Sequence, residues 1–553
     1  MRRLGPCSAL LLAGVLLVRR CGLVTAQWVP FAAAAGVCLL GYVVFWAYFA
    51  HRRLGAALAI ASWLAAVVFL VRERARLRAW WGDPEGGRTA LACMALIGAG
   101  YIALLHLHGS PLPLEELAQQ RFVPGLPADN MIPRCFAERL ARGASPRNLI
   151  GDWQSSDRPP LEAGIVLLAR ALSKAAKAEN VAAAQSAGLF FELLWVPALW
   201  GLLRELGMSL RRSAGVVALC SASGFFLLQS LYVWPKLGGA ALAIGAFGLA
   251  FGTRPAPARI VAAGVCAALA WLSHGGLAFA LIAMAALAPL ALRGVAPKAL
   301  LAAGGAFAAL ASPWFVYQRV YEPPGNRLLK WHLAGVVDID ARGVVETLAD
   351  SYRAVGLAGA VANKRENLTT TFRGPAALLW DFSAGGAERR RDATSFHFFL
   401  ALGPWNLVWV LVPWLWLRRA RVRSLDLRLC ALLLAWSFVT YAVWVLLLFG
   451  PQATLVHQGP LTMHGVWFPL LLALAWTWNR WLFLGLAAWH LLAFATTWPP
   501  AASRLGGETS VAAALVLGVV VAASAVAVAR CGRVRRPAHP HALKERPARC
   551  PTS

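Results

Sequence analysis

Long apolar runs alternate with shorter polar segments along almost the whole chain. The runs are about twenty residues long, which is the length that an α-helix needs to cross roughly 30 Å of hydrocarbon. None of them shows the alternation of period two that is typical of a membrane β-barrel strand. We therefore predict an all-α polytopic membrane protein of about fifteen spans, at 7–25, 29–49, 54–71, 88–107, 183–203, 213–231, 237–252, 258–274, 276–292, 298–317, 397–417, 428–449, 463–478, 481–497 and 508–529.

Basic residues gather in the short segments on one side of this arrangement. The clusters lie at 72–78, 204–212, 254–259, 293–298, 418–428 and 530–549. Because cytoplasmic loops of membrane proteins carry an excess of Lys and Arg, we assign that side to the cytoplasm. Arg52 and Arg53 fall on the other side and do not fit this rule. The two longest polar segments, 108–182 and 318–396, and the turn at 451–462 are then predicted to face outward.

Composition supports a membrane protein and makes several other classes less plausible. Only 14% of the residues are charged and 59% are hydrophobic, against about 25% charged in an ordinary soluble domain. The net charge of +28 is explained by orientation in the membrane, so we expect membrane lipids as partners and no nucleic acid. The cysteines show no Cys-x-x-Cys spacing, and no phosphate-binding or dinucleotide-binding glycine motif occurs. No spacing of His, Asp and Glu amounts to a metal site, so we predict no metal and no cofactor.

The outward segment 108–182 carries the most informative polar residues. Asp129 and Asn130 precede a stretch, 131–143, in which Ile132, Phe136 and Leu140 recur at helical spacing with charges between them. This spacing predicts an amphipathic helix at the membrane surface. Asp129 lies near its N-terminus, where the helix dipole favours an ionised carboxylate. A plain N-cap is the alternative role for this residue.

Four short elements follow one another within this segment. They are Asp129-Asn130, Ala137-Glu138-Arg139, Gly151-Asp152-Trp153 and Arg158-Pro159-Pro160-Leu161. Their order resembles that in membrane-embedded glycosyltransferases of the GT-C fold that use polyprenyl-phosphate sugars, a group containing protein O-mannosyltransferases and the aminoarabinose transferase of lipid A. The chain departs from the family pattern at Asn130, where the family has Glu, and at Arg158, where it has Lys. Asn cannot act as a base, whereas Arg keeps the positive charge and suits phosphate.

The resemblance implies a GT-C-like helix bundle over 88–530, with the outward loops 108–182 and 318–396 carrying the active site. Residues 1–87 would be extra N-terminal transmembrane segments, and 531–553 a basic cytoplasmic tail. The implied function is inverting transfer of a sugar from a polyprenyl-phosphate donor to a lipid, glycan or protein acceptor. The reaction would take place at the outer face of the cytoplasmic (inner) membrane, in which the protein is multi-pass.

Such a transfer needs a carboxylate to take the acceptor proton and cations to stabilise the departing phosphate. Asp129 is the candidate base, and Asp157 is a second catalytic candidate that could instead shape a turn. The candidate phosphate ligands are Arg158, Lys236, Arg327 and Lys330. The candidate substrate-binding residues are Asn130, His332 and His457. The plain alternative is that cations at span ends are interfacial anchors and that the histidines are satisfied locally.

Two functions of other classes compete with this prediction. A transporter or flippase of lipid-linked saccharides would place polar residues within its spans and show internal repeats. Glu192 is the clearest charge within a predicted span, and no repeat is visible. A non-catalytic scaffold would use the outward segment only as an interface.

Overall fold

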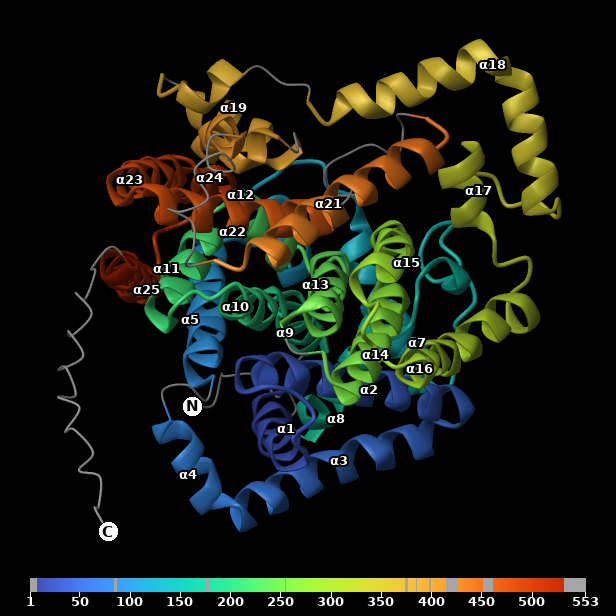
Figure 1. Ribbon diagram of the computed structural model, residues 1–553. Helices are drawn as coiled ribbons and strands as arrows, with labels where there is room; N and C mark the ends of the chain where they lie inside the picture. The colour runs from blue at the N-terminus through green and yellow to red at the C-terminus, as the bar shows by residue number, and fades with distance from the viewer. Residues whose placement is uncertain are drawn as a thin grey trace, which may run out of the picture.

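The computed structural model describes residues 7–83, 87–175, 180–253, 255–372, 376–383, 385–396, 399–413, 425–450 and 461–531. Within these ranges the protein is built from helices, and only two isolated β-bridges occur. The helices pack into one bundle, with α13 (Leu237–Phe251) near its middle and α25 (Val511–Cys531) and α18 (Val344–Thr370) at different edges (Figure 1). The predicted all-α class is confirmed.

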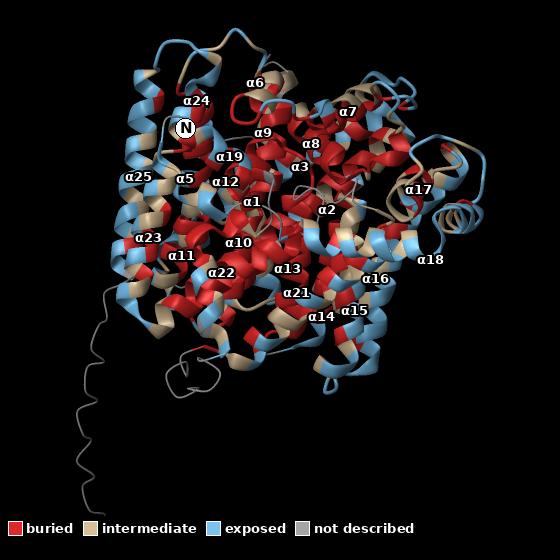
Figure 2. Ribbon diagram, turned by 90° about the horizontal axis from the view of Figure 1, so that it is seen from above, coloured by how far each residue is buried: buried red, intermediate tan, exposed pale blue. Residues whose placement is uncertain are grey.

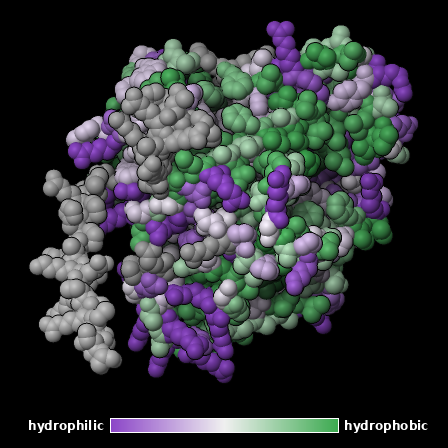
Figure 3. Space-filling view, in the orientation of Figure 1, coloured by the Kyte–Doolittle hydropathy of each residue, from purple (hydrophilic) through white to green (hydrophobic). Residues whose placement is uncertain are grey.

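Nine helices within the described ranges are long and apolar enough to cross a membrane. They are built from α2 (Val29–Ala50), α3 (Arg52–Arg72), α5 (Arg88–Leu105), α9 (Asn180–Glu192) continued by α10 (Trp195–Glu205), α16 (Pro297–Val316), α21 (Leu427–Leu447), α22 (Leu461–Trp478), α23 (Arg480–Ala495) and α25. Broad apolar areas, separated by hydrophilic patches, lie on the face of the bundle that Figure 3 shows. The described part of the chain is thus consistent with an all-α multi-pass membrane protein.

Nine of the fifteen predicted spans correspond to these long apolar helices in the part of the chain that the structure describes. The other apolar runs form shorter helices or a bent pair. These are α1 (Ser8–Cys21), α13, α14 (Pro257–Ser273), α15 (Ala278–Ala291), η7 (Leu400–Leu411) and the pair α11 (Leu210–Ser221) and α12 (Gly224–Leu231), which is bent by 72°. A helix enclosed by other helices is apolar all round, as a lipid-exposed span is, so composition alone does not separate the two.

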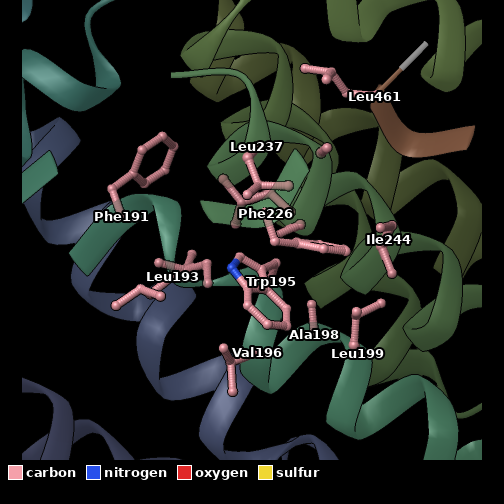
Figure 4. Close-up of a cluster of buried hydrophobic side chains, with 14 of the residues drawn as sticks. Phe191, Leu193, Trp195, Val196, Ala198, Leu199, Phe226, Leu237, Ile244 and Leu461 are labelled. Atoms are coloured by element: carbon pink, nitrogen blue, oxygen red, sulfur yellow. The ribbon is translucent and has the colours of Figure 1, made fainter. Parts of the chain in front are cut away.

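The centre of the bundle is closely packed around α13. Every residue of α13 is buried, and α10, α13 and α22 are buried where α25, α16 and α18 are largely exposed (Figure 2). Its glycines make room for aromatic rings, because a Cβ atom at Gly245 would lie 1.9 Å from the ring of Phe31. Trp195 and Phe226 pack nearby with ring centroids 4.4 Å apart (Figure 4). This rigid centre supports the start of α13, where Lys236 lies.

The outward segment forms a layer of short helices. These are α6 (Leu114–Gln120), η2 (Ala128–Met131), α7 (Ile132–Arg142), η3 (Ser155–Asp157) and α8 (Leu161–Ala175). The predicted amphipathic helix is α7, and Ile132, Phe136 and Leu140 are its buried face. It ends at Gly143, whose φ of 73° is the left-handed conformation that glycine adopts without strain.

The second outward segment divides between two places. Its first part comprises η5 (Tyr317–Tyr321) and α17 (Arg327–Ala334), and α18 follows with a break at Gly356. Its second part comprises η6 (Ala376–Trp380) and α19 (Gly386–Phe396), which packs against α12 and against α24 (Trp498–Ala502). Figure 1 shows α17 and α18 at one edge of the bundle and α19 beside α23 and α24. Only the first part reaches the candidate site.

The N-terminal helices pack into the same core as the outward segment. α2 lies along α8 so closely that a Cβ atom at Gly164 would be 2.3 Å from the carbonyl oxygen of Gly41. Trp63 of α3 donates its indole N–H to the carbonyl of Leu168, at 3.1 Å. Residues before 88 therefore support α8 directly. The tail from 532 onward lies outside the described residues.

Loops predicted to share a side are in contact with one another. At one end, Arg327 of the second segment lies 3.3 Å from Asp157 of the first. At the other end, Glu205 pairs with Arg259 at 2.6 Å and accepts a hydrogen bond from Gln27 at 2.6 Å. The short helix α13 runs from the end that holds Asp157 and Arg327 towards the end that holds Glu205 and Arg259. Near the end of α13, Gly248 lies beside Trp28, and its carbonyl oxygen accepts a hydrogen bond from Arg259.

Candidate functional site

A buried ion pair joins the two most prominent residues of the predicted site. Arg158 Nη2 lies 2.7 Å from Asp129 Oδ2, and each residue is 8% exposed. The guanidinium also lies over the Trp153 ring, 4.1 Å from its centroid. Arg158 has extended backbone, as the proline after it favours. A carboxylate and an indole thus fix the orientation of the guanidinium.

Lys236 adds a second cation to this pair. It is the N-cap residue of α13, it is 1% exposed, and its ammonium lies 2.9 Å from the centroid of the Trp234 ring. Its charge interacts with those of Arg158, Asp129 and Glu192. The structure therefore brings together three residues that are about thirty and eighty positions apart in the sequence.

Two glutamates complete the cluster. Glu162, in the first turn of α8, is 2% exposed, and Glu192, at the end of α9, is fully buried. Glu192 Oε2 accepts a hydrogen bond from the main-chain N–H of Gly238 at 2.9 Å, at the start of α13. The two carboxylates interact electrostatically with each other, and Glu162 also interacts with Arg158. The two carboxylates repel each other, and the attractions of Glu162 to Arg158 and of Glu192 to Lys236 oppose this repulsion.

Glu162 was not among the residues predicted for the site, and Glu192 was predicted only as a charge within a span. A signal was present for both: Glu192 is an acidic residue within an apolar run, and Glu162 directly follows the Arg-Pro-Pro-Leu element at the start of another. A charge in such a place is costly unless it serves a buried site.

Three of these residues, Asp129, Arg158 and Glu162, line a narrow cavity. Its volume is about 10 Å³, and its polar lining comes from Asp129, Arg158, Glu162 and Ser273. Apolar walls come from Phe136, Pro159, Trp234 and other neighbours. The space is smaller than a sugar ring, so a substrate has to part these walls when it binds.

Asp157 and Arg327 lie apart from this lining and connect the two outward segments. Besides their 3.3 Å contact, Arg327 donates to the carbonyl oxygen of Asp152 at 2.7 Å and pairs with its carboxylate. Gln154 donates its N–H to Asp157 Oδ2 at 3.1 Å. Burial raises the pKa of Asp157 to about 6, against the opposing effect of Arg327 and Arg158. This geometry indicates that Asp157 and Arg327 hold the two outward segments together and do not contact a substrate in the cavity.

Lys330 and His332 are both on α17. Lys330 is 1% exposed and pairs with Asp340 of its own loop. The Nδ1–H of His332 donates a hydrogen bond to the carbonyl oxygen of Leu328, at 2.7 Å. Burial lowers the pKa of His332, and the charges of Lys236 and Arg158 act in the same direction. His332 therefore lies at the border of the cluster, while Lys330 is held by its own loop.

The remaining predicted residues lie beside or outside the described site. Asn130 donates its side-chain N–H to the carbonyl of Glu115 at 3.1 Å and faces a second cavity behind Asp129. His457 falls in 451–460, outside the described residues. His274 was not among the candidate residues; it interacts electrostatically with Lys236, Arg158 and His332, and its Nδ1 accepts the N–H of Gly276 at 3.0 Å.

In the part of the chain that the structure describes, no three His, Cys, Asp or Glu side chains are grouped as a metal site. No protein-family model, curated protein or solved structure matches the chain.

Proposed function

We propose that the protein is an inverting glycosyltransferase that uses a polyprenyl-phosphate sugar at the outer face of the cytoplasmic membrane. The observation that supports this proposal best is the buried group formed by Asp129, Arg158 and Lys236. It combines one carboxylate with two cations beside a cavity, where two polar segments meet at one end of an apolar bundle. A phosphate needs the cations, and an acceptor hydroxyl needs the carboxylate.

In the proposed reaction the donor phosphate binds Arg158 and Lys236. The acceptor oxygen attacks the anomeric carbon and gives its proton to Asp129, while the bond from that carbon to the phosphate oxygen breaks. The electron pair stays on the phosphate, whose added charge the two cations stabilise. A single displacement of this kind inverts the anomeric centre.

Because Asp129 and Arg158 form an ion pair, binding of the donor phosphate to Arg158 would also change the state of Asp129. A phosphate that binds the forked guanidinium competes with Asp129 for it, because both are oxyanions that accept the same N–H groups. Donor binding therefore frees the carboxylate to accept a proton. Before the donor binds, Asp129 Oδ2 accepts a hydrogen bond from Arg158 Nη2 at 2.7 Å.

A transporter or flippase of lipid-linked saccharides is the second candidate, and one observation favours it. Glu192 lies midway along the continuous apolar segment Asn180–Glu205 and is fully buried. α9, however, packs against α6 and α8 of the outward segment, and Glu192 interacts with Glu162 of α8, so it lies where that segment meets the bundle. This position agrees better with a site open to the outer face.

The direct test is a transfer assay with the purified full-length protein. Polyprenyl phosphates carrying radiolabelled hexoses or pentoses are supplied with an extract of cell-envelope lipids, glycans and proteins. We expect label to enter an acceptor with inverted configuration and bare polyprenyl phosphate to be released. Movement of the intact donor across liposomes without release of the phosphate would favour the flippase instead.

A further inference from the structure

A second small cavity lies behind Asp129, between the outward segment and the bundle. Asn130, Glu162 and Gln185 contribute to its lining from η2, α8 and α9, together with Glu115 and Arg134. Its volume is about 10 Å³, which is room for about one water-sized particle. It is shared between three elements that are far apart in the sequence.

Three buried oxygen atoms around this cavity have no hydrogen-bond partner among the described residues. They are Asn130 Oδ1, Glu162 Oε2 and Gln185 Oε1. The residues are 4%, 2% and 7% exposed. A buried polar atom without a partner costs about 1–3 kcal/mol, so three in one place call for a common ligand.

The orientation of both amides is determined by their other contacts. Asn130 Nδ2 donates to the carbonyl of Glu115 at 3.1 Å, and Gln185 Nε2 donates to the carbonyl of Leu231 at 2.7 Å. If either amide were flipped, its oxygen would face a carbonyl oxygen and both would be repelled. The amide oxygens are thus the atoms left without partners.

The charges around the cavity also favour a positive ligand. Arg134 pairs with both Glu115 and Glu138, at 2.8 Å from Glu115 Oε2 and 2.9 Å from Glu138 Oε1. Arg142 pairs with the other oxygen of Glu138 at 3.1 Å, so these two arginines and two glutamates are neutral together, and Glu162 supplies the remaining carboxylate at the cavity. One water molecule has two O–H groups and cannot serve three acceptors, whereas a cation attracts all of them.

We infer that Asn130, Glu162 and Gln185 bind one hard cation through oxygen. One carboxylate and two amide oxygens are ligands that suit Na⁺, Mg²⁺ or Ca²⁺ and not a soft, sulfur-preferring metal. The bound ion would join η2 to α8 and α9 and so fix the segment that carries Asp129. This site is independent of whether the protein transfers sugar.

The test measures thermal unfolding of the purified full-length protein after chelation and dialysis. Na⁺, Mg²⁺ and Ca²⁺ are added separately, with N-methylglucamine chloride holding the ionic strength constant. We expect one of them to raise the Tm in a saturable way. Glu162→Gln and Gln185→Met should each weaken the apparent affinity by about tenfold or more.

Glu116→Gln is the matched control. Glu116 lies on α6 next to Glu115 and is outside the cavity lining, so the variant loses the same charge in the same layer. It should bind the cation like the parent. The inference is overturned if no cation shifts the Tm specifically, or if Glu162→Gln responds as the parent and Glu116→Gln do. The assay does not involve sugar transfer, so its failure is distinct from that of the proposed function.

Discussion

At the scale of single residues, the site is a set of buried charges whose partners determine their roles. Arg158 has both a carboxylate and an indole as neighbours, while Lys330 is paired with Asp340. A phosphate would therefore have to displace Asp129 from Arg158, but Asp340 from Lys330. Arg158 lines the cavity, and Lys330 does not.

Substitution of Arg158 tests the phosphate role. Arg158→Ala should slow transfer by about 10²–10³-fold, the loss typical of one electrostatic donor. Arg158→Lys keeps the charge but not the fork or the stacking on Trp153, so a smaller loss is expected. Donor titration of both variants provides the measurement, with Tm reporting on folding. Equal losses in the two variants would indicate that the guanidinium is needed for structure and not for its charge. Normal activity of the Ala variant would rule out phosphate binding by Arg158.

Asp157 should make stability depend on pH. Its pKa is raised from 3.8 to about 6, so the folded protein holds a proton that the unfolded chain releases in this range. Its contribution is complete below pH 3.8 and is lost as the pH rises through about 6. The effect is on the order of 3 kcal/mol.

Asp157→Asn removes this titration and keeps most of the shape. The fall in Tm between pH 4 and pH 7 should be smaller for the variant than for the parent, measured in the same detergent. Identical pH profiles would show that Asp157 does not titrate in this range.

At the scale of elements, close contacts between helices hold the site in place. Gly41 and Gly164 let α2 approach α8, which begins directly after the Arg-Pro-Pro element. Lys236 depends in turn on the buried start of α13.

Gly164→Ala should destabilise the protein by about 1–3 kcal/mol or more, because its Cβ would meet backbone atoms of α2 that cannot move aside. Gly304→Ala is the control, since Gly304 lies in α16 with nothing within 4 Å of the added atom. Thermal denaturation of both variants makes the comparison. Equal Tm values would contradict the close packing of α2 on α8.

Part of the arrangement of helices was predictable from the sequence. The positions of the long apolar helices follow from the apolar runs, and the amphipathic face of α7 follows from periodicity, whereas the other short helices of the outward segments were not predicted. The closeness of Asp129 and Arg158 was inferred only through a resemblance, and it depends on how η2 and η3 fold. Glu162 was missed because its importance arises from α9 packing against α8, a contact that no local pattern reveals. The pairing of Arg327 with Asp152 and Asp157 likewise depends on loop conformation.

At the scale of the whole molecule, polar segments gather at one end of an apolar bundle. The predicted topology places this end outside the cell. Ser145→Cys and Ala354→Cys introduce thiols at exposed positions of the two outward segments. Both should react with an impermeant thiol reagent on intact cells, whereas native exposed Cys21, beside the basic residues Arg19 and Arg20, should react only after permeabilisation. The reverse pattern would overturn the topology.

The central claim is that Asp129 is the base of a sugar transfer at this end. Asp129→Asn keeps the size of the side chain and can still accept a hydrogen bond from Arg158, but it cannot take a proton. The measurement is the rate of transfer by the purified variant at saturating lipid donor, beside Glu116→Gln as the control. We expect Asp129→Asn to fold normally and lose about 10²–10⁴-fold in rate. A rate within a few-fold of the parent would contradict the account.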